Sequence, residues 1–156
     1  MAPQRILLMR HAEKSGDPLD ENLAPAGVAR AARLATYIPA TFGKTGFLFA
    51  TAASKHSLRP IQTIQPLSTA INVPINASFA DQDYGALAQE ILANAKYDGA
   101  FVLICWHHGN IPPLANALGA GAGSCPNPWD SAVFNLILQF DYGVGAPTVT
   151  AIVEPF

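Results

Sequence analysis

Short apolar runs alternate with longer amphipathic segments along this chain. Three runs, at 5–9, 46–50 and 100–106, consist almost wholly of apolar residues. Runs of this length are typical of strands that are buried on both faces of a sheet. We therefore expect three buried strands within the first two thirds of the sequence.

The segments between these runs repeat apolar residues at helical spacing. Residues 26–37 place Val28, Ala31 and Leu34 close to a 3.6-residue period, and Pro25 suits the first position of a helix. The same signals predict further helices at 61–71 after Pro60, at 84–95, and at 112–118 before Gly119. Strands and helices therefore alternate.

This alternation indicates an α/β fold, a three-layer α/β/α sandwich with a mostly parallel sheet and right-handed crossovers. The C-terminal part differs, because 119–130 is a turn-rich loop and 133–140 and 148–154 have the pattern of two further strands. We expect these two strands to pair antiparallel at an edge of the sheet. No internal repeat or long linker divides the chain, so we expect a single domain over 1–156.

Composition and charge exclude several classes of protein. Half of the 156 residues are hydrophobic and only 13% are charged, against about 25% in average soluble domains, which excludes charge-driven disorder. Nine Lys and Arg against eleven Asp and Glu give a net charge of −2, so we expect neither nucleic acid nor a membrane as partner. The apolar runs are shorter than a transmembrane span or a secretion signal, and we expect a cytoplasmic protein. Cys105 and Cys125 have no CxxC spacing, which predicts neither a disulfide framework nor a zinc site.

Histidines and arginines gather where predicted strands end. Arg10 and His11 follow the first strand, while His107 and His108 follow the strand that ends at Trp106. Sites in parallel sheets lie at the carboxyl ends of the strands. Imidazole is a nucleophile near neutral pH, and one guanidinium group can bind two phosphate oxygens at once. These residues together favour phosphoryl transfer through a covalent phosphohistidine.

Four motifs resemble those of the histidine phosphatase superfamily, which includes phosphoglycerate mutase-like enzymes and small phosphohistidine phosphatases. They occur in the family's order, at 7–14 (LLMRHAEK), 23–32 (LAPAGVARAA), 54–63 (SKHSLRPIQT) and 102–112 (VLICWHHGNIP). Ala12 stands where Gly is commoner, and the spacing from Ser54 to Arg59 is one residue longer than usual. The resemblance covers residues 5 to about 118 and implies a phosphoglycerate mutase-like fold.

The resemblance also implies roles for particular residues. His11 would be the nucleophile, while Arg10, Arg59 and a second histidine would hold the equatorial oxygens of the phosphoryl group. The position relative to the strand favours His107 as this second histidine. The His-Gly-Asn triplet favours His108, which we take as the catalytic one, with His107 flanking the pocket.

The family usually supplies a proton to the leaving group from a carboxylic acid, here in the segment 79–84 (FADQDY). The family's common glutamate, followed by glycine and tryptophan, is absent. We take Asp81 as the first choice of acid and Asp83 as the second. Asp83 is equally suited to cap the helix that begins near Tyr84.

A second tier of residues has the chemistry to contact substrate. The candidates are Lys14, Lys55, His56, His107, Asp83 and Asn110. Solvated loop charge is the alternative for the two lysines, and a hydrogen bond at a helix entry is the alternative for His56.

The function that these features favour is a metal-independent phosphohydrolase that acts on a phosphorylated small molecule or a phosphoprotein. Two alternatives remain open: a phosphoglycerate mutase-like phosphotransferase, and a catalytically silent module that binds phosphate or phosphoprotein. We expect no cofactor and no metal, because the chain has no HxH, HExxH or GxGxxG pattern.

The loop 119–130 has the length to fold over the site. Low charge and the final edge strands allow a homodimer.

Overall fold

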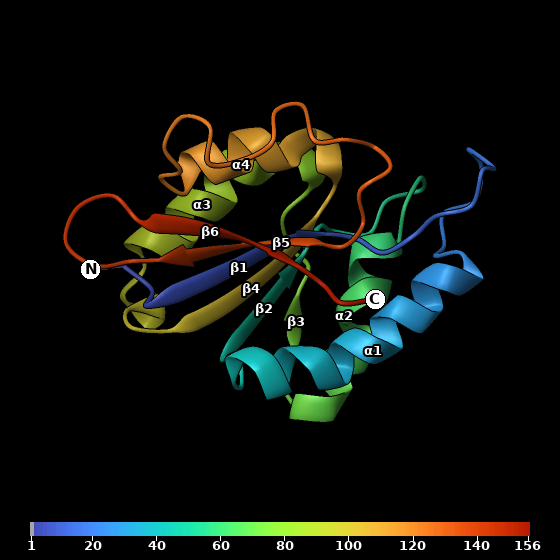
Figure 1. The fold of residues 1–156 in the computed structure, drawn as a ribbon, viewed down its shortest axis with the longest axis horizontal. Helices are drawn as coiled ribbons and strands as arrows, with labels where there is room; N and C mark the ends of the chain where they lie inside the picture. Colours follow the sequence, from blue (N-terminus) through green and yellow to red (C-terminus); the bar gives the residue numbers. More distant parts are fainter. Residues whose placement is uncertain (1) are drawn as a thin grey trace.

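The computed structural model describes residues 2–156 and contains one mixed sheet covered by helices on both faces (Figure 1). Its strands, in the spatial order β3-β2-β4-β1-β5-β6, are β1 (Arg5–Arg10), β2 (Phe47–Ala50), β3 (Ile75–Asn76), β4 (Phe101–Trp106), β5 (Leu136–Asp141) and β6 (Thr148–Val153). The first four are mutually parallel, whereas β5 is antiparallel to both β1 and β6. The expected α/β class and antiparallel edge are confirmed.

Four α-helices connect and cover these strands. They are α1 (Pro25–Phe42), α2 (Arg59–Ile71), α3 (Tyr84–Ala93) and α4 (Ile111–Ala117). Helices α1 and α2 pack on one face of the sheet, where Leu34 and Ile64 meet alternate residues of β1 such as Leu7. Helices α3 and α4 pack on the other face, where Leu87 and Leu114 join the second core cluster. Figure 1 shows the two helix pairs on opposite sides of the strands.

The element bounds differ from those expected from the sequence in a few places. Helix α1 continues through Pro39 to Phe42, where Tyr37 packs edge-to-face on Phe42 with ring centroids 5.9 Å apart. Strand β3 has only two residues and no apolar run, so periodicity gave no signal for it. Strand β5 begins at Leu136 rather than at 133, because the Val133 carbonyl oxygen accepts side-chain hydrogen bonds instead of ladder bonds.

Three short 3-10 helices lie at the ends of longer elements: η1 (Asp81–Asp83), η2 (Ala95–Tyr97) and η3 (His108–Asn110). Two of them, η1 and η3, precede α3 and α4 directly, and they carry residues that the sequence identified as candidates. Within residues 2–156, no helix has the length and apolarity needed to cross a membrane.

Candidate active site

The register of β1 and β4 brings two histidines together at the carboxyl end of the sheet. Arg10 is the register partner of Trp106, and the His11 backbone N–H donates to the Trp106 carbonyl oxygen at 3.1 Å. His11 and His107 are therefore neighbours across the two strands. Their rings meet edge-to-face, with centroids 5.3 Å apart and planes at 70°.

His11 is buried, with 2% of its surface exposed, and its ring is held in one tautomer. Its Nδ1 lies 2.7 Å from the Ala12 carbonyl oxygen. Because that oxygen can only accept, Nδ1 carries the proton and Nε2 keeps a free lone pair. Burial lowers the pKa of His11 to about 3. The hydrogen bond to the Ala12 carbonyl raises this pKa, whereas the charges of His107, Arg10 and Arg59 lower it by smaller amounts. The ring is therefore neutral near pH 7.

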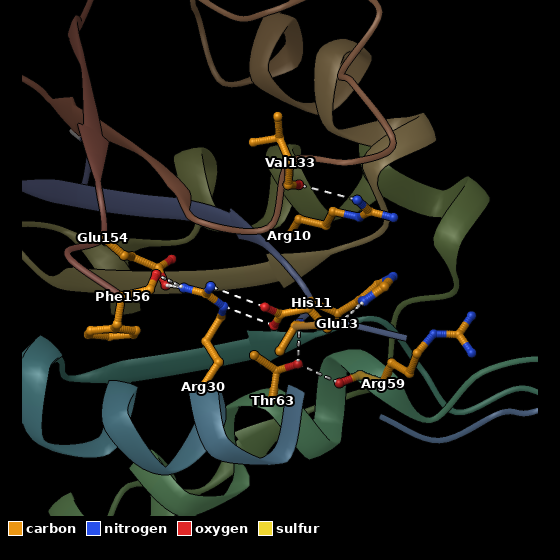
Figure 2. Close-up of polar contacts among 10 residues, drawn as sticks. Arg10, His11, Glu13, Arg30, Arg59, Thr63, Val133, Glu154 and Phe156 are labelled. Atoms are coloured by element: carbon orange, nitrogen blue, oxygen red, sulfur yellow. Dashed lines mark hydrogen bonds and ion pairs between the residues drawn. The ribbon is translucent and has the colours of Figure 1, made fainter. Parts of the chain in front are cut away.

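A buried threonine connects the residue after His11 to helix α2. The Ala12 N–H donates to Thr63 Oγ1 at 2.9 Å, and the Thr63 hydroxyl donates to the Arg59 carbonyl oxygen at 2.8 Å (Figure 2). Thr63 lies one helical turn after Arg59, on the same side of α2. Thr63 was not among the candidates predicted from the sequence, although its four-residue spacing from Arg59 was a usable signal.

Arg10 is as deeply buried as His11, and one end of its guanidinium is fixed. Nη1 donates to the carbonyl oxygens of Ser131 at 2.7 Å and Val133 at 3.2 Å. The guanidinium carbon lies over the Phe134 ring, 3.9 Å from its centroid. Nε and Nη2 are buried without a partner among the described residues. Burial and the nearby Arg59 lower the pKa of Arg10 to about 10, so the group stays charged at neutral pH.

Arg59 begins helix α2 and approaches the site from the other side. Its Nη1 donates to the Asp20 carbonyl oxygen at 2.7 Å, while its buried Nε has no partner within residues 2–156. Burial lowers the pKa of Arg59, and Asp20 opposes that change. Figure 2 shows the side chains of Arg10, His11 and Arg59 extending to the same side of the strand ends.

A cavity of about 590 Å³ opens beside His11 and Arg59. Seven of the residues singled out in the sequence line it: His11, Lys14, His56, Arg59, Asp81, His107 and His108. Four others, Arg10, Lys55, Asp83 and Asn110, are not among its lining residues. Arg10 is enclosed by Phe134 and the neighbouring carbonyl groups, and Lys55 is exposed.

Asp81 lines this cavity and has an unpartnered carboxyl oxygen. Its backbone carbonyl oxygen accepts from Trp106 Nε1 at 3.2 Å and from Asn110 Nδ2 at 3.3 Å, which fixes the residue. Its Oδ1 is buried and has no hydrogen-bond partner in the described chain. Asp83 is exposed at the start of α3 and makes no side-chain capping hydrogen bond. Of the two acidic residues, Asp81 lines the cavity and Asp83 does not.

The two adjacent histidines differ in their contacts. His107 packs on His11, whereas His108 begins η3, away from that ring pair, although it also lines the cavity. Burial lowers the pKa of both His107 and His108, and in each case the Asp81 charge opposes it. Strand register therefore brings the ring of His107, and not that of His108, against the ring of His11.

Most of the turn-rich loop 119–130 lies away from this cavity, although its last two residues, Trp129 and Asp130, lie close to the contacts of Arg10. It lines a separate cavity of about 390 Å³ beside α4, and none of its residues is among those that line the cavity at His11. The segment that does approach the site follows this loop, at Ser131, Val133 and Phe134. Sequence spacing gave no indication of these contacts.

An ion-pair network supports the segment after His11 from outside the cavity. Arg30 pairs with Glu13, Nε to Oε1 at 2.9 Å and Nη2 to Oε2 at 3.1 Å. The third nitrogen, Nη1, reaches Glu154 Oε1 at 2.8 Å and the Phe156 carbonyl oxygen at 2.7 Å (Figure 2). Helix α1 therefore joins the segment after His11 to the residues that follow β6.

No group of three or more His, Cys, Asp or Glu side chains is arranged to hold a metal ion in the part of the chain that the structure describes.

Comparison with known proteins identifies the fold. No protein-family model matches the sequence, and no curated protein matches it either. Among solved structures, the chain is similar to the protein histidine phosphatase SixA complexed with tungstate, with 18% identity, a TM-score of 0.67 and 96% of each chain covered. It is also similar to the putative phosphohistidine phosphatase SixA of Agrobacterium tumefaciens (18% identity, TM-score 0.62, 97% and 99% covered). A third is the Entamoeba histolytica phosphoserine phosphatase in complex with 3-phosphoglyceric acid (15% identity, TM-score 0.65, 96% of each chain).

Proposed function

We propose that this chain, which has the fold of the histidine phosphatases, hydrolyses phosphorylated small molecules or phosphoproteins through a phosphohistidine formed on His11. The observation that carries the proposal is the state of His11: a buried, neutral ring whose Nδ1 proton is used by Ala12, so that Nε2 is free to attack. The names of the similar proteins support this reaction class, since all three are described as phosphatases.

The first step is attack of the His11 Nε2 lone pair on phosphorus. The N–P bond forms as the bond from phosphorus to the leaving oxygen breaks, and that oxygen keeps the electron pair. It takes a proton from the carboxylic acid of Asp81, whose buried Oδ1 has no partner in the described chain. In the second step Asp81 removes a proton from water, whose oxygen attacks phosphorus. The N–P bond breaks, its electrons return to Nε2, and inorganic phosphate leaves.

The negative charge of the phosphoryl group is stabilised by hydrogen-bond donors that are already in place. Arg10 offers Nε and Nη2, Arg59 offers Nε, and His107 offers a ring N–H beside the nucleophile. Phosphoryl transfer depends mainly on positioning and electrostatic stabilisation of the equatorial oxygens. Donors that are buried and fixed before the substrate binds need little reorganisation during the reaction.

The proposal is tested by the hydrolysis of a generic aryl phosphate in the presence of a chelator. We expect turnover by the wild-type protein, and a loss of at least about three orders of magnitude in kcat for His11→Asn. The remote surface variant Lys44→Ala serves as control and keeps full activity. A strict requirement for divalent metal, or an unchanged rate in the folded His11→Asn variant, would overturn the proposal.

A further inference from the structure

We propose that Phe134 is a positioning residue that fixes the phosphate-binding edge of Arg10, an inference that rests on the proposed function. Its ring lies over the Arg10 guanidinium, with the central carbon 3.9 Å from the ring centroid. Stacking of this kind restrains motion out of the guanidinium plane. No signal in the sequence connects these two residues, which lie far apart along the chain.

Motion of the Arg10 guanidinium within its own plane is restrained by the segment that carries Phe134. Arg10 Nη1 donates to the Ser131 and Val133 carbonyl oxygens, and the Val133 oxygen also accepts from Trp129 Nε1 at 3.1 Å. Trp129 is buried in the core cluster beside α3 and α4. The segment 129–134 is thus anchored to the core and holds the guanidinium by one end and one face.

The remaining edge of the Arg10 guanidinium, formed by Nε and Nη2, is suited to bind a phosphate. Nε–H and one N–H of Nη2 point in the same direction from a guanidinium, at a spacing that matches two oxygens of one phosphate. Both nitrogens are buried and unpartnered within residues 2–156. An arginine already locked in this orientation does not need to be ordered when the anion binds.

Phe134 is not explained as part of the hydrophobic core. Its neighbours Val133 and Leu136 pack against the core cluster of α3 and α4, but among the described residues Phe134 is in neither sheet core nor in contact with one. Its aromatic contacts are with Arg10 and with the ring of His11, whose centroid is 6.2 Å away. The side chain therefore faces the two residues on which the proposed reaction depends.

Because the Phe134 ring also lies beside the His11 ring, its loss has a second readout. Burial is the main reason for the low pKa of His11. Removal of a neighbouring aromatic ring admits water and raises that pKa toward the ordinary value for histidine. In Phe134→Ala, the acidic limb of the kcat/KM profile accordingly moves to higher pH. A role in folding alone would not move it.

The experiment is calorimetric titration with inorganic phosphate of the wild type, Phe134→Leu and Phe134→Tyr. We expect Leu to weaken phosphate binding about tenfold and Tyr, which keeps the aromatic face, to bind within about threefold of wild type. Phe47→Leu is the matched control, because Phe47 is also partly buried and lies under a cation, Lys96 Nζ at 5.6 Å. Phe134→Met provides a second non-aromatic variant if Leu does not fold.

The outcomes separate this inference from the proposed function. Phosphate binding as tight in both non-aromatic variants as in the wild type overturns the role of Phe134, even if the wild type hydrolyses phosphate esters. Absence of phosphate binding in the wild type also overturns it. Weakened binding in the non-aromatic variants with rescue by Tyr supports it, including the case in which the wild type binds phosphate but turns over no ester.

Discussion

The ring of His107 lies edge-to-face against the ring of His11, with centroids 5.3 Å apart. The contact follows from parallel pairing, since the register ends at the pair Arg10 and Trp106, and His11 and His107 are the next residue after each strand. In the proposed mechanism, the ring in this position would donate to an oxygen of the phosphoryl group on His11. His108, one residue further along, lines the cavity but does not meet that ring.

This arrangement predicts unequal effects for the two neighbouring histidines. We expect His107→Ala to lower kcat for an aryl phosphate about 100-fold, as is typical for the loss of one donor to developing charge. His108→Ala should change kcat by less than about fivefold, because its ring is farther from the nucleophile. Steady-state kinetics on both variants measures this, and a larger loss from His108→Ala would assign the role to the other histidine.

The low pKa of His11 predicts how stability depends on pH. The folded-state pKa is about 3, whereas an unfolded histidine titrates near 6.5, so the unfolded state binds more protons between these values. The free energy of unfolding should therefore decrease as pH falls below about 6.5, by up to about 1.4 kcal/mol per pH unit. Burial also lowers the pKa of His107, which adds in the same direction.

Urea unfolding between about pH 5 and pH 7 measures this slope. In His11→Asn the slope should become shallower, because one of the groups that takes up a proton on unfolding is gone. A slope identical to that of the wild type would show that His11 titrates normally in the folded protein.

Gly27 in helix α1 is predicted to be irreplaceable for steric reasons. A Cβ atom added there would lie 2.3 Å from the Glu13 carbonyl oxygen and 2.9 Å from the Glu13 nitrogen. Both are backbone atoms of the segment that follows His11, so neither can move without displacing that segment. We expect Gly27→Ala to destabilise the protein by about 2 kcal/mol or more, despite the better helix propensity of alanine.

Gly85 in helix α3 is the matched control for Gly27, since an added Cβ there meets no atom within 4 Å. Gly85→Ala should be neutral or stabilise the protein by up to about 1 kcal/mol. Thermal unfolding of the two variants is the measurement. Similar melting temperatures for both would contradict the close approach of α1 to Glu13.

Arg30 is predicted to be important because it neutralises a buried carboxylate. Glu154 is only 3% exposed; burial raises its pKa, while Arg30 lowers it. Arg30→Leu leaves this charge unpaired and should cost about 3–5 kcal/mol of stability at neutral pH. The loss should shrink as the pH falls, because protonation of Glu154 removes the buried charge.

Arg33→Leu is the control for Arg30, because Arg33 is exposed on the same helix. The guanidinium groups of both residues lie over the Phe156 ring, at 5.4 Å for Arg30 and 5.5 Å for Arg33. Chemical unfolding at two pH values compares them. An equal and pH-independent loss in both variants would mean that the Glu154 charge is not the cause.

The sequence predicted the central strands well, but it did not predict contacts between residues that lie far apart along the chain. Strands β1 and β4 are buried on both faces, so their apolar runs were unambiguous, whereas β3 is two residues long and depends on pairing with β2. The positions of His11 and Arg59 at element ends could be predicted from local pattern. Which histidine contacts the His11 ring depends on the register between distant strands, and the contact of Phe134 with Arg10 depends on a loop path that no local pattern encodes.

The most direct test of the account is to trap the phosphorylated protein. After brief mixing with an aryl phosphate and a denaturing quench at alkaline pH, mass spectrometry should find one acid-labile phosphoryl group on the peptide that contains His11. The group should be absent in His11→Asn and should be lost from the wild type as substrate is exhausted. Turnover without a phosphoryl group on His11 at any time, or a phosphoryl group on another residue at full occupancy, would contradict the mechanism.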